Sequence, residues 1–127
     1  TISGAGTAVK MAGTTTAISE RSFTHTSNKL LYSGQRTSRF WISATVTLDV
    51  ASGTDTLSVQ IFKTGSLITG SEQRISNTAG LPGQVTVMID TTLATGDYVE
   101  IYVENEDTTA NIDVTQAYML CLGVMGE

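Results

Sequence analysis

The sequence contains one cysteine, one proline and one histidine in 127 residues. A single cysteine cannot form an intrachain disulfide, so packing and contacts with partner chains must stabilise the fold. A single histidine excludes a histidine-rich zinc site, and no nucleophile with an orienting acid lies beside it. Because no set of acid, base and nucleophile can be assembled, we expect a protein that is not an enzyme, with no catalytic residue, cofactor or metal ion.

Positive charge and long apolar runs are also scarce. Lys and Arg number 7 against 12 Asp and Glu, which gives a formal net charge of −5. A protein that binds the nucleic-acid backbone needs a basic face, so we expect no nucleic-acid partner. No apolar run approaches the roughly 20 residues that span a bilayer, so we expect no membrane partner either.

Alternating apolar and polar residues are the main pattern that is present, and residues 39–50 show it best. Side chains alternate across a β-strand, so one face of this stretch should lie in a core. The apolar side holds Phe40, Ile42, Ala44, Val46, Leu48 and Val50. The polar side holds Arg39, Ser43, Thr45, Thr47 and Asp49, with Trp41 as the large exception.

Further short strands are predicted over residues 56–63, 84–90 and 98–104, with turns at Ser27-Asn28 and over 63–66. Seven to nine strands without a convincing helix indicate an all-β protein, a two-sheet antiparallel sandwich or jelly roll. We divide the chain into an N-terminal arm or edge segment, 1–22, and a jelly-roll domain, 23–127. A flexible terminus is the alternative for residues 1–22.

The last predicted strand, 112–124, is apolar or small on both faces. One face holds Ile112, Val114, Tyr118, Leu120, Leu122 and Val124, and the other holds Ala117, Met119, Cys121 and Gly123. A strand buried on both faces needs two covers. The opposite sheet supplies one, and we infer that another subunit supplies the second. Periodicity does not say which face meets which cover.

A family resemblance follows from the order of these motifs. The strand over 40–50 precedes a turn at Lys63 to Gly65, the sequence LATGDYVEI over 93–101 and the final stretch AYMLCLGV. This order resembles the jelly rolls of the tumour necrosis factor and complement globular-head family, over about residues 23–125. The stretch FTHTSNKLLYSG, 23–34, further resembles small structural proteins of tailed bacteriophages that carry this fold. Disulfides and Asn-x-Ser/Thr sites are lacking, which argues against an animal signalling role.

The resemblance implies a homotrimer around a threefold axis with the final strand at the interface. Tyr118, Leu120 and Leu122 match the face that family members turn to the axis. Trp41 and Met88 are further candidates for the trimer interface, because each is apolar on the polar side of its strand. For Trp41, a place on a half-covered sheet edge is the alternative.

The implied role is that of a bacteriophage virion structural protein, a trimeric capsid decoration (cement) protein that stabilises the head. Its partners would be itself and the major capsid protein or other virion proteins, and its location the capsid surface or the tail. The alternative is a receptor-binding head domain of a tail fibre or spike, which would contact a host surface receptor through the loops 51–55, 64–71, 77–83 and 105–111. A weak calcium site at Glu104, Glu106 and Asp107 remains open beside a solvated acidic loop.

Overall fold

The computed structural model describes residues 2, 4–11 and 23–123, and this part of the chain forms ten β-strands. None of the described residues lies in a helix that could cross a bilayer. The strands are β1 (Val9–Lys10), β2 (Phe23–Thr26), β3 (Lys29–Tyr32), β4 (Ser38–Val50), β5 (Thr54–Lys63), β6 (Ser66–Leu67), β7 (Gln73–Thr78), β8 (Gly83–Leu93), β9 (Tyr98–Asn105) and β10 (Ile112–Gly123).

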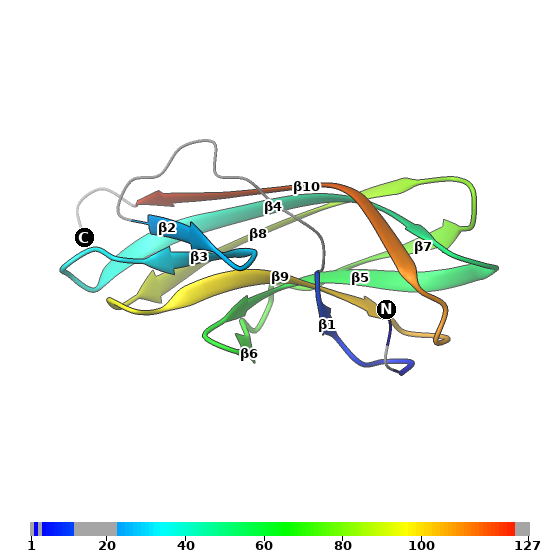
Figure 1. The fold of residues 1–127 in the computed structure, drawn as a ribbon, viewed down its shortest axis with the longest axis horizontal. Helices are drawn as coiled ribbons and strands as arrows, with labels where there is room; N and C mark the ends of the chain where they lie inside the picture. Colours follow the sequence, from blue (N-terminus) through cyan, green and yellow to red (C-terminus); the bar gives the residue numbers. More distant parts are fainter. Residues whose placement is uncertain (1, 3, 12–22, 124–127) are drawn as a thin grey trace.

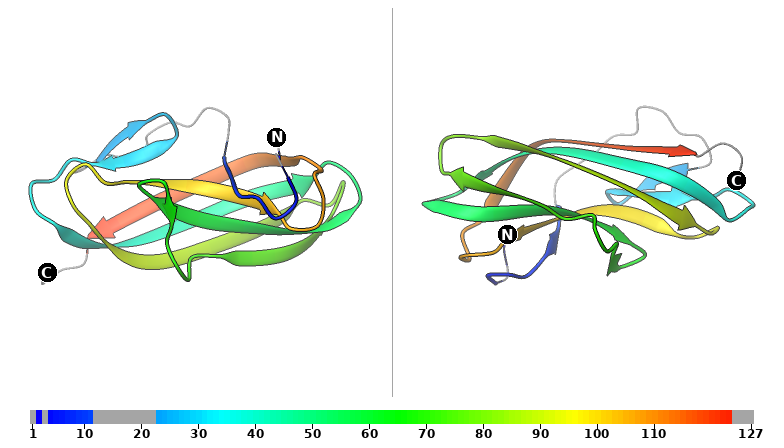
Figure 2. Two further views of the ribbon diagram at one scale, coloured as in Figure 1. Left: turned by 90° about the horizontal axis from the view of Figure 1, so that it is seen from below. Right: turned by 180° about the vertical axis from the view of Figure 1, so that it is seen from behind.

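The strands form two antiparallel sheets that pack face to face, as Figures 1 and 2 show. The smaller sheet has the order β10-β4-β8. The larger sheet has the order β2-β3-β9-β5-β6, with β1 beside β9 and β7 beside β5. The chain changes sheet between β3 and β4, between β4 and β5, and again at each step from β7 to β10. This order, β10-β4-β8 against β3-β9-β5-β7, is jelly-roll-like, so the expected all-β sandwich is confirmed.

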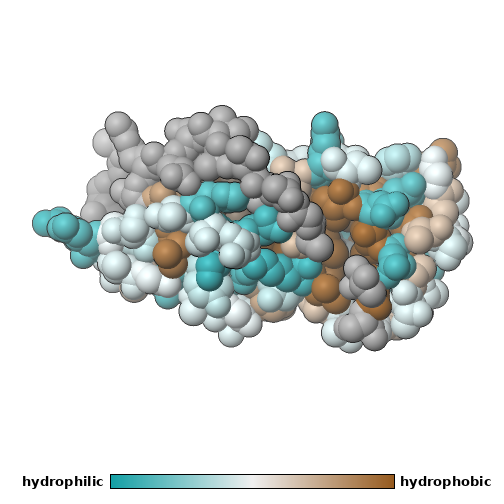
Figure 3. Space-filling view, viewed as in Figure 1, coloured by the Kyte–Doolittle hydropathy of each residue, from teal (hydrophilic) through white to brown (hydrophobic). Residues whose placement is uncertain are grey.

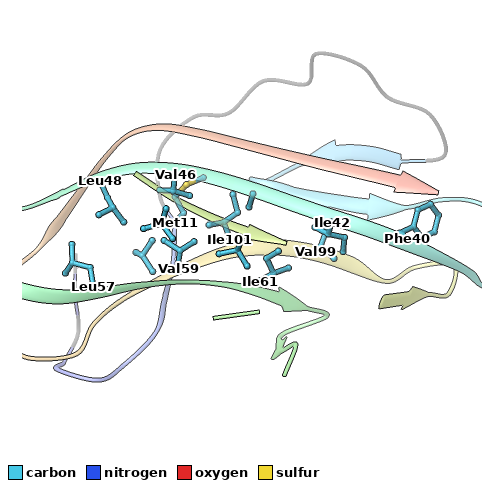
Figure 4. Close-up of a cluster of buried hydrophobic side chains, with 14 of the residues drawn as sticks. Met11, Phe40, Ile42, Val46, Leu48, Leu57, Val59, Ile61, Val99 and Ile101 are labelled. Carbon is cyan, nitrogen blue, oxygen red and sulfur yellow. The ribbon is translucent and has the colours of Figure 1, made fainter. Parts of the chain in front are cut away.

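The strand β4 shows why the sheets pack. Its predicted apolar row points inward, and Ile42, Ala44, Val46 and Leu48 are fully buried. Leu57, Val59 and Ile61 of β5 face this row from the larger sheet and are also fully buried. Figure 4 shows the labelled members of both rows between the two layers: Ile42, Val46, Leu48, Leu57, Val59 and Ile61. Period-two patterning in two strands thus produces one dry core.

Two tight hairpins follow the predicted turns. Ser27 and Asn28 take φ values of 48° and 57° between β2 and β3. Thr64 and Gly65 take 48° and 84° between β5 and β6. Two successive residues with positive φ make a turn whose twist matches that of antiparallel strands. Asn and Gly accept this conformation at low cost, which explains why the chain reverses at these places.

Three aromatic rings close the core where β4 begins. The ring centroids of Phe23, Tyr32 and Phe40 lie 5.0 to 5.4 Å apart in tilted and edge-on contacts. The Tyr32 hydroxyl donates to the Arg36 carbonyl oxygen over 2.6 Å. The Tyr32 ring lies directly against Gly34, so a Cβ atom at residue 34 would overlap the ring. Glycine is therefore required for this close approach.

Replacing Gly34 by alanine should destabilise the fold by about 1 to 3 kcal/mol, because the buried Tyr32 ring has to move. Urea unfolding would measure the change. The matched control is Gln35→Ala, an exposed neighbour that should change stability by less than about 0.5 kcal/mol. Equal stability of Gly34→Ala and the control would show that the ring is free to shift.

The described part of the N-terminal segment is attached to the larger sheet. Val9 pairs with Val103, and the Met11 amide donates to the Ile101 carbonyl oxygen over 3.0 Å. The Met11 side chain is buried in the core. Residues 2 and 4–11 therefore form an edge of the sandwich. The predicted boundary at residue 22 lies outside the described residues and stays a prediction.

A β-bulge in β10 corrects the predicted faces of the last strand. The register against β4 shifts between Val114 and Gln116, so the alternation changes phase there. Ile112 and Val114 therefore point into the core instead of sharing a face with Tyr118. Val124 lies outside the described residues. Figure 3 shows hydrophobic surface between β1 and this descending part of β10, where the core reaches the side of the sandwich.

Candidate functional site: the outer face of the three-stranded sheet

The outer face of the sheet β10-β4-β8 carries a group of exposed apolar side chains, here called the apolar patch. The exposed fraction is 55% for Trp41, 67% for Met88, 53% for Tyr118, 38% for Leu120 and 51% for Leu122. These are the five residues predicted for a trimer interface, and the structure places all of them on this one face. Whether they contact another subunit stays a prediction.

Strand register brings the apolar patch together from three strands. Leu122 lies opposite Trp41, and in the next row Leu120 lies opposite Ser43, which lies opposite Met88. Tyr118 follows one row further along β10. Residues directly opposite on one face have neighbouring side chains. The bulge therefore determines which residues of β10 belong to the patch. After the bulge, the large apolar side chains of β10 lie on the outer face instead of in the core.

Trp41 lies on the middle strand of the sheet, so the alternative of a sheet-edge position does not hold. Beside it, the Arg39 guanidinium donates to one Asp90 carboxylate oxygen over 2.6 Å and 3.0 Å. Both charged side chains are roughly half exposed, so this ion pair contributes little to stability. It closes one end of the apolar patch with opposite charges.

Polar side chains occupy the other half of the same outer face. The hydroxyls of Thr45 and Thr86 lie 3.1 Å apart and share a hydrogen bond. The next row consists of Gln116, Thr47 and Gln84, which lie opposite one another across the three strands. The face is therefore divided into an apolar half and a polar half.

The inner face of β10 packs Ala117, Met119 and Cys121 against the core. Burial raises the pKa of the Cys121 thiol to about 12. Since the thiolate is the reactive form, Cys121 is a small core residue and no nucleophile at neutral pH. This agrees with its place on the covered face.

Cys121 should react with a thiol reagent at pH 8 at least about tenfold more slowly in the folded protein than in urea. The folded state retains the thiol proton up to about pH 12, whereas the unfolded state loses it near pH 8.5. Stability should therefore fall as the pH rises between these values. The variant Leu120→Cys is the control. Its added thiol would lie on the exposed outer face of β10 and should react fast at low protein concentration. Equal rates would contradict the assigned faces.

The outer face of the larger sheet differs, because its side chains contact one another. Gln60 is 2% exposed, and its amide donates to Glu72 over 2.6 Å and to Glu104 over 2.8 Å. Phe62 and Tyr102 stack with ring centroids 3.7 Å apart and planes at 6°. This face has no group of exposed large apolar side chains among the described residues.

The acidic loop after β9 uses its carboxylates internally. Glu106 accepts from the Arg74 guanidinium over 2.7 and 2.9 Å, and Asp107 accepts from the Thr56 amide over 2.7 Å. No group of three or more His, Cys, Asp or Glu side chains that could hold a metal ion occurs in residues 2, 4–11 and 23–123. The described loop is thus a folded, hydrogen-bonded turn, and calcium binding by Glu104, Glu106 and Asp107 stays a prediction.

A buried asparagine fixes this loop. The Asn105 side chain donates to Asp55 over 2.9 Å and to the Ala110 carbonyl oxygen over 3.1 Å. Its oxygen accepts from the amides of Asp107 and Thr108, each over 3.0 Å. Hydrogen bonds from Asn105 and Thr108 lower the pKa of the Asp55 carboxyl. Sequence reasoning missed this network, since an Asn at a strand end carries no signal of burial.

Asn105→Ala should lower the free energy of unfolding by about 2 to 3 kcal/mol, because it leaves several buried groups unpaired. Chemical denaturation would measure it against Thr109→Ala, an exposed loop substitution expected to cost less than about 0.5 kcal/mol.

The lowered pKa of Asp55 adds an acid dependence. The stabilisation that the ionised Asp55 gives to the folded state is fully present above about pH 4, the pKa of an unfolded Asp. It is lost as the pH falls through the lowered pKa of the folded state. Asp55→Asn should flatten the fall in stability at acid pH, and an unchanged slope would contradict this role.

Comparisons with known proteins add little to this description. No family model matches the chain, and no curated protein matches it. Among solved structures, a family 35 carbohydrate binding module from an environmental isolate is similar with 19% sequence identity and a TM-score of 0.37. The match covers 93% of this chain and 84% of that chain. At this TM-score the likeness carries no argument about function.

Proposed function

We propose that the chain is a self-associating structural protein of a bacteriophage virion, a homotrimeric decoration protein that stabilises the capsid. The observation that supports self-association is the apolar patch, whose side chains are exposed on the outer face of the sheet β10-β4-β8. A contiguous exposed apolar patch on a soluble domain marks an interaction site more often than not. The virion role rests on the resemblance of the motifs over 23–34 and 93–101.

A second copy of the chain is the occupant that fits the patch. Ser43 is small and lies between Leu120 and Met88, whereas the neighbouring row carries the large Trp41. The same surface therefore places a large side chain beside a small one, against which another copy could pack. Arg39 is the one basic residue among the described residues that borders the patch, and it is paired with Asp90. As far as residues 2, 4–11 and 23–123 show it, this surface offers no free positive charge, so it suits an anionic membrane or nucleic acid poorly.

Association would stabilise each subunit in a simple way. Burial of apolar surface contributes about 25 cal/mol per Å², from which the entropic cost of association is subtracted. Trp and Tyr side chains contribute most to interfaces of this kind. Three copies, as the resemblance implies, would cover each patch with its neighbours and form a unit that bridges capsid subunits at a site of matching symmetry.

Replacing Trp41 or Leu122 by serine should weaken self-association at least about tenfold, because each change removes a large exposed apolar side chain from the patch. Sedimentation equilibrium at micromolar concentration would measure it, with the unchanged chain expected to be a trimer. The matched control is Leu81→Ser, since Leu81 is 69% exposed in the loop between β7 and β8, away from the patch. A monomeric unchanged chain, or equal weakening by Leu81→Ser, would contradict the proposed interface.

The location in the virion is tested by immunogold labelling of purified phage particles with antibodies against the protein. Gold over the whole head surface is expected for a decoration protein. Label confined to the tail tip would favour the receptor-binding head instead. Particles without any label would contradict both.

One observation favours the receptor-binding alternative. The loops after β4, β7 and β9 meet at one end of the sandwich in Figure 1, and buried asparagines hold two of them. The Asn77 side chain accepts from the Val50 amide over 2.7 Å and donates to the Leu81 carbonyl oxygen over 2.9 Å. Loops held in one conformation lose little entropy when they bind a receptor.

A further inference from the structure

One edge of β9 is covered by two different elements, and the second of them is the described N-terminal segment. On its other edge, β9 pairs with β5 from Val99 to Asn105. On this edge, β3 pairs only with Tyr98 and Val99. Residues 4–11, together with Ile2, cover the rest and are here called the closing segment. Without it, the second half of β9 would be an open strand edge, which is a template for pairing with another chain.

Backbone hydrogen bonds and a buried side chain hold the closing segment in place. The Gly6 amide donates to the Asn105 carbonyl oxygen over 2.7 Å, and the Met11 amide donates to the Ile101 carbonyl oxygen over 3.0 Å. The Met11 side chain is 7% exposed and belongs to the core cluster. A strand that takes this place must therefore bring an apolar side chain to the position of Met11.

Lys10 adds a requirement for positive charge on the opposite face of the strand. Its ammonium group lies 2.5 Å from a Glu100 carboxylate oxygen and donates to the Ser27 carbonyl oxygen over 2.7 Å. The Glu100 side chain is 7% exposed, and a carboxylate in such a place is unfavourable without a cationic partner. The site therefore selects a basic residue directly before the apolar one, which is the pair Lys10-Met11.

The closing segment can leave while the strands around it stay paired. The strand β1 has two residues and lies beside β9, off the main path of the larger sheet. When β1 leaves, β9 keeps β5 and β3 as partners. The turn before β1 contains Gly4 and Gly6, and Gly6 takes a φ of 70°. Terminal segments with few strand pairs open at a lower free-energy cost than central strands.

We propose that the edge of β9 from Ile101 to Asn105 is a strand-acceptor site, which the chain's own closing segment occupies and which the closing segment of a second copy can take. Every copy carries a segment that fits this site through Met11 and the Lys10–Glu100 pair. Recognition is by strand addition, in which backbone hydrogen bonds hold the segment and alternate side chains give specificity. The exchange does not depend on the apolar patch, which lies on the other sheet.

Two single-cysteine variants of the full chain test the exchange. Residues 11 and 101 share a backbone hydrogen bond, so Lys10 and Tyr102 form the adjacent pair without one. The Cβ atoms of such a pair are close enough for a disulfide. An equal mixture of Lys10→Cys and Tyr102→Cys chains, oxidised with glutathione disulfide, should therefore give a mixed disulfide-linked dimer.

The matched control replaces Tyr102→Cys by Phe62→Cys. This change breaks the same ring stack, but residue 62 lies on β5, one strand further from residue 10. The dimer with Tyr102→Cys should be at least about tenfold more abundant than the dimer with Phe62→Cys, because only the former position lies opposite residue 10. Adding Trp41→Ser to both chains should leave the yield unchanged, since Trp41 belongs to the apolar patch.

A synthetic peptide of residues 2–11 gives a second measurement on the full chain. Lys10→Glu places a carboxylate beside Glu100 and should loosen the chain's own closing segment. The fluorescent peptide keeps its lysine and should bind this variant at least about tenfold more tightly than the unchanged chain, whose own segment competes. A peptide with Met11→Ser should bind at least about tenfold more weakly, because it brings no apolar side chain to the core. Fluorescence anisotropy measures both.

Three results would overturn the inference. They are equal dimer yields with Tyr102→Cys and Phe62→Cys, loss of the dimer when Trp41→Ser is added, and no peptide binding to a Lys10→Glu chain that circular dichroism shows to be folded. Each of them leaves the proposed trimer to be judged by sedimentation. A chain that is monomeric by sedimentation but still exchanges its closing segment would contradict the trimer alone.

Discussion

Within residues 2, 4–11 and 23–123, protein covers only one face of the smaller sheet, and the rest of the structure depends on that constraint. Its inner face supplies half of the core through the buried row of β4. Its outer face has no layer above it among the described residues. A three-stranded sheet with one covered face is stable when the other face is polar, as it is along Thr45 and Thr47. The apolar patch departs from this rule, because large apolar side chains are exposed there.

At the ends of the strands, buried polar side chains form hydrogen bonds with backbone groups that strand pairing leaves without a partner. Ser71 accepts from the Ile61 amide over 3.2 Å and donates to the Ile68 carbonyl oxygen over 2.7 Å. Asn77 and Asn105 do the same for the loops at the other end of the sandwich. In the described residues, no buried side-chain nitrogen or oxygen lacks a hydrogen-bond partner. The buried polar groups beneath the exposed face are therefore hydrogen-bonded within the described part of the chain.

Much of this architecture could be predicted from alternation alone. The faces of β4 and β5 follow from strict period-two patterns, and the reversal at Ser27-Asn28 follows from its residues. The phase of β10 could not be predicted, because a bulge adds one residue without changing composition. Periodicity extended across that point grouped Ile112 with Tyr118, which lie on opposite faces. The burial of Gln60 could not be predicted either, because its side chain is satisfied by the carboxylates of Glu72 and Glu104, which are distant in the sequence.

The extent of the apolar patch matters as much as its presence. An apolar face that ran the full length of the sheet would allow copies to slide along one another and associate without a defined end. Here the Arg39–Asp90 pair borders the patch at one end, and Thr and Gln rows border it at the other. Desolvating those polar rows without new hydrogen bonds costs free energy, so a shifted arrangement is penalised. In the proposed trimer, the bounded patch would confine the contact between copies to one part of the face.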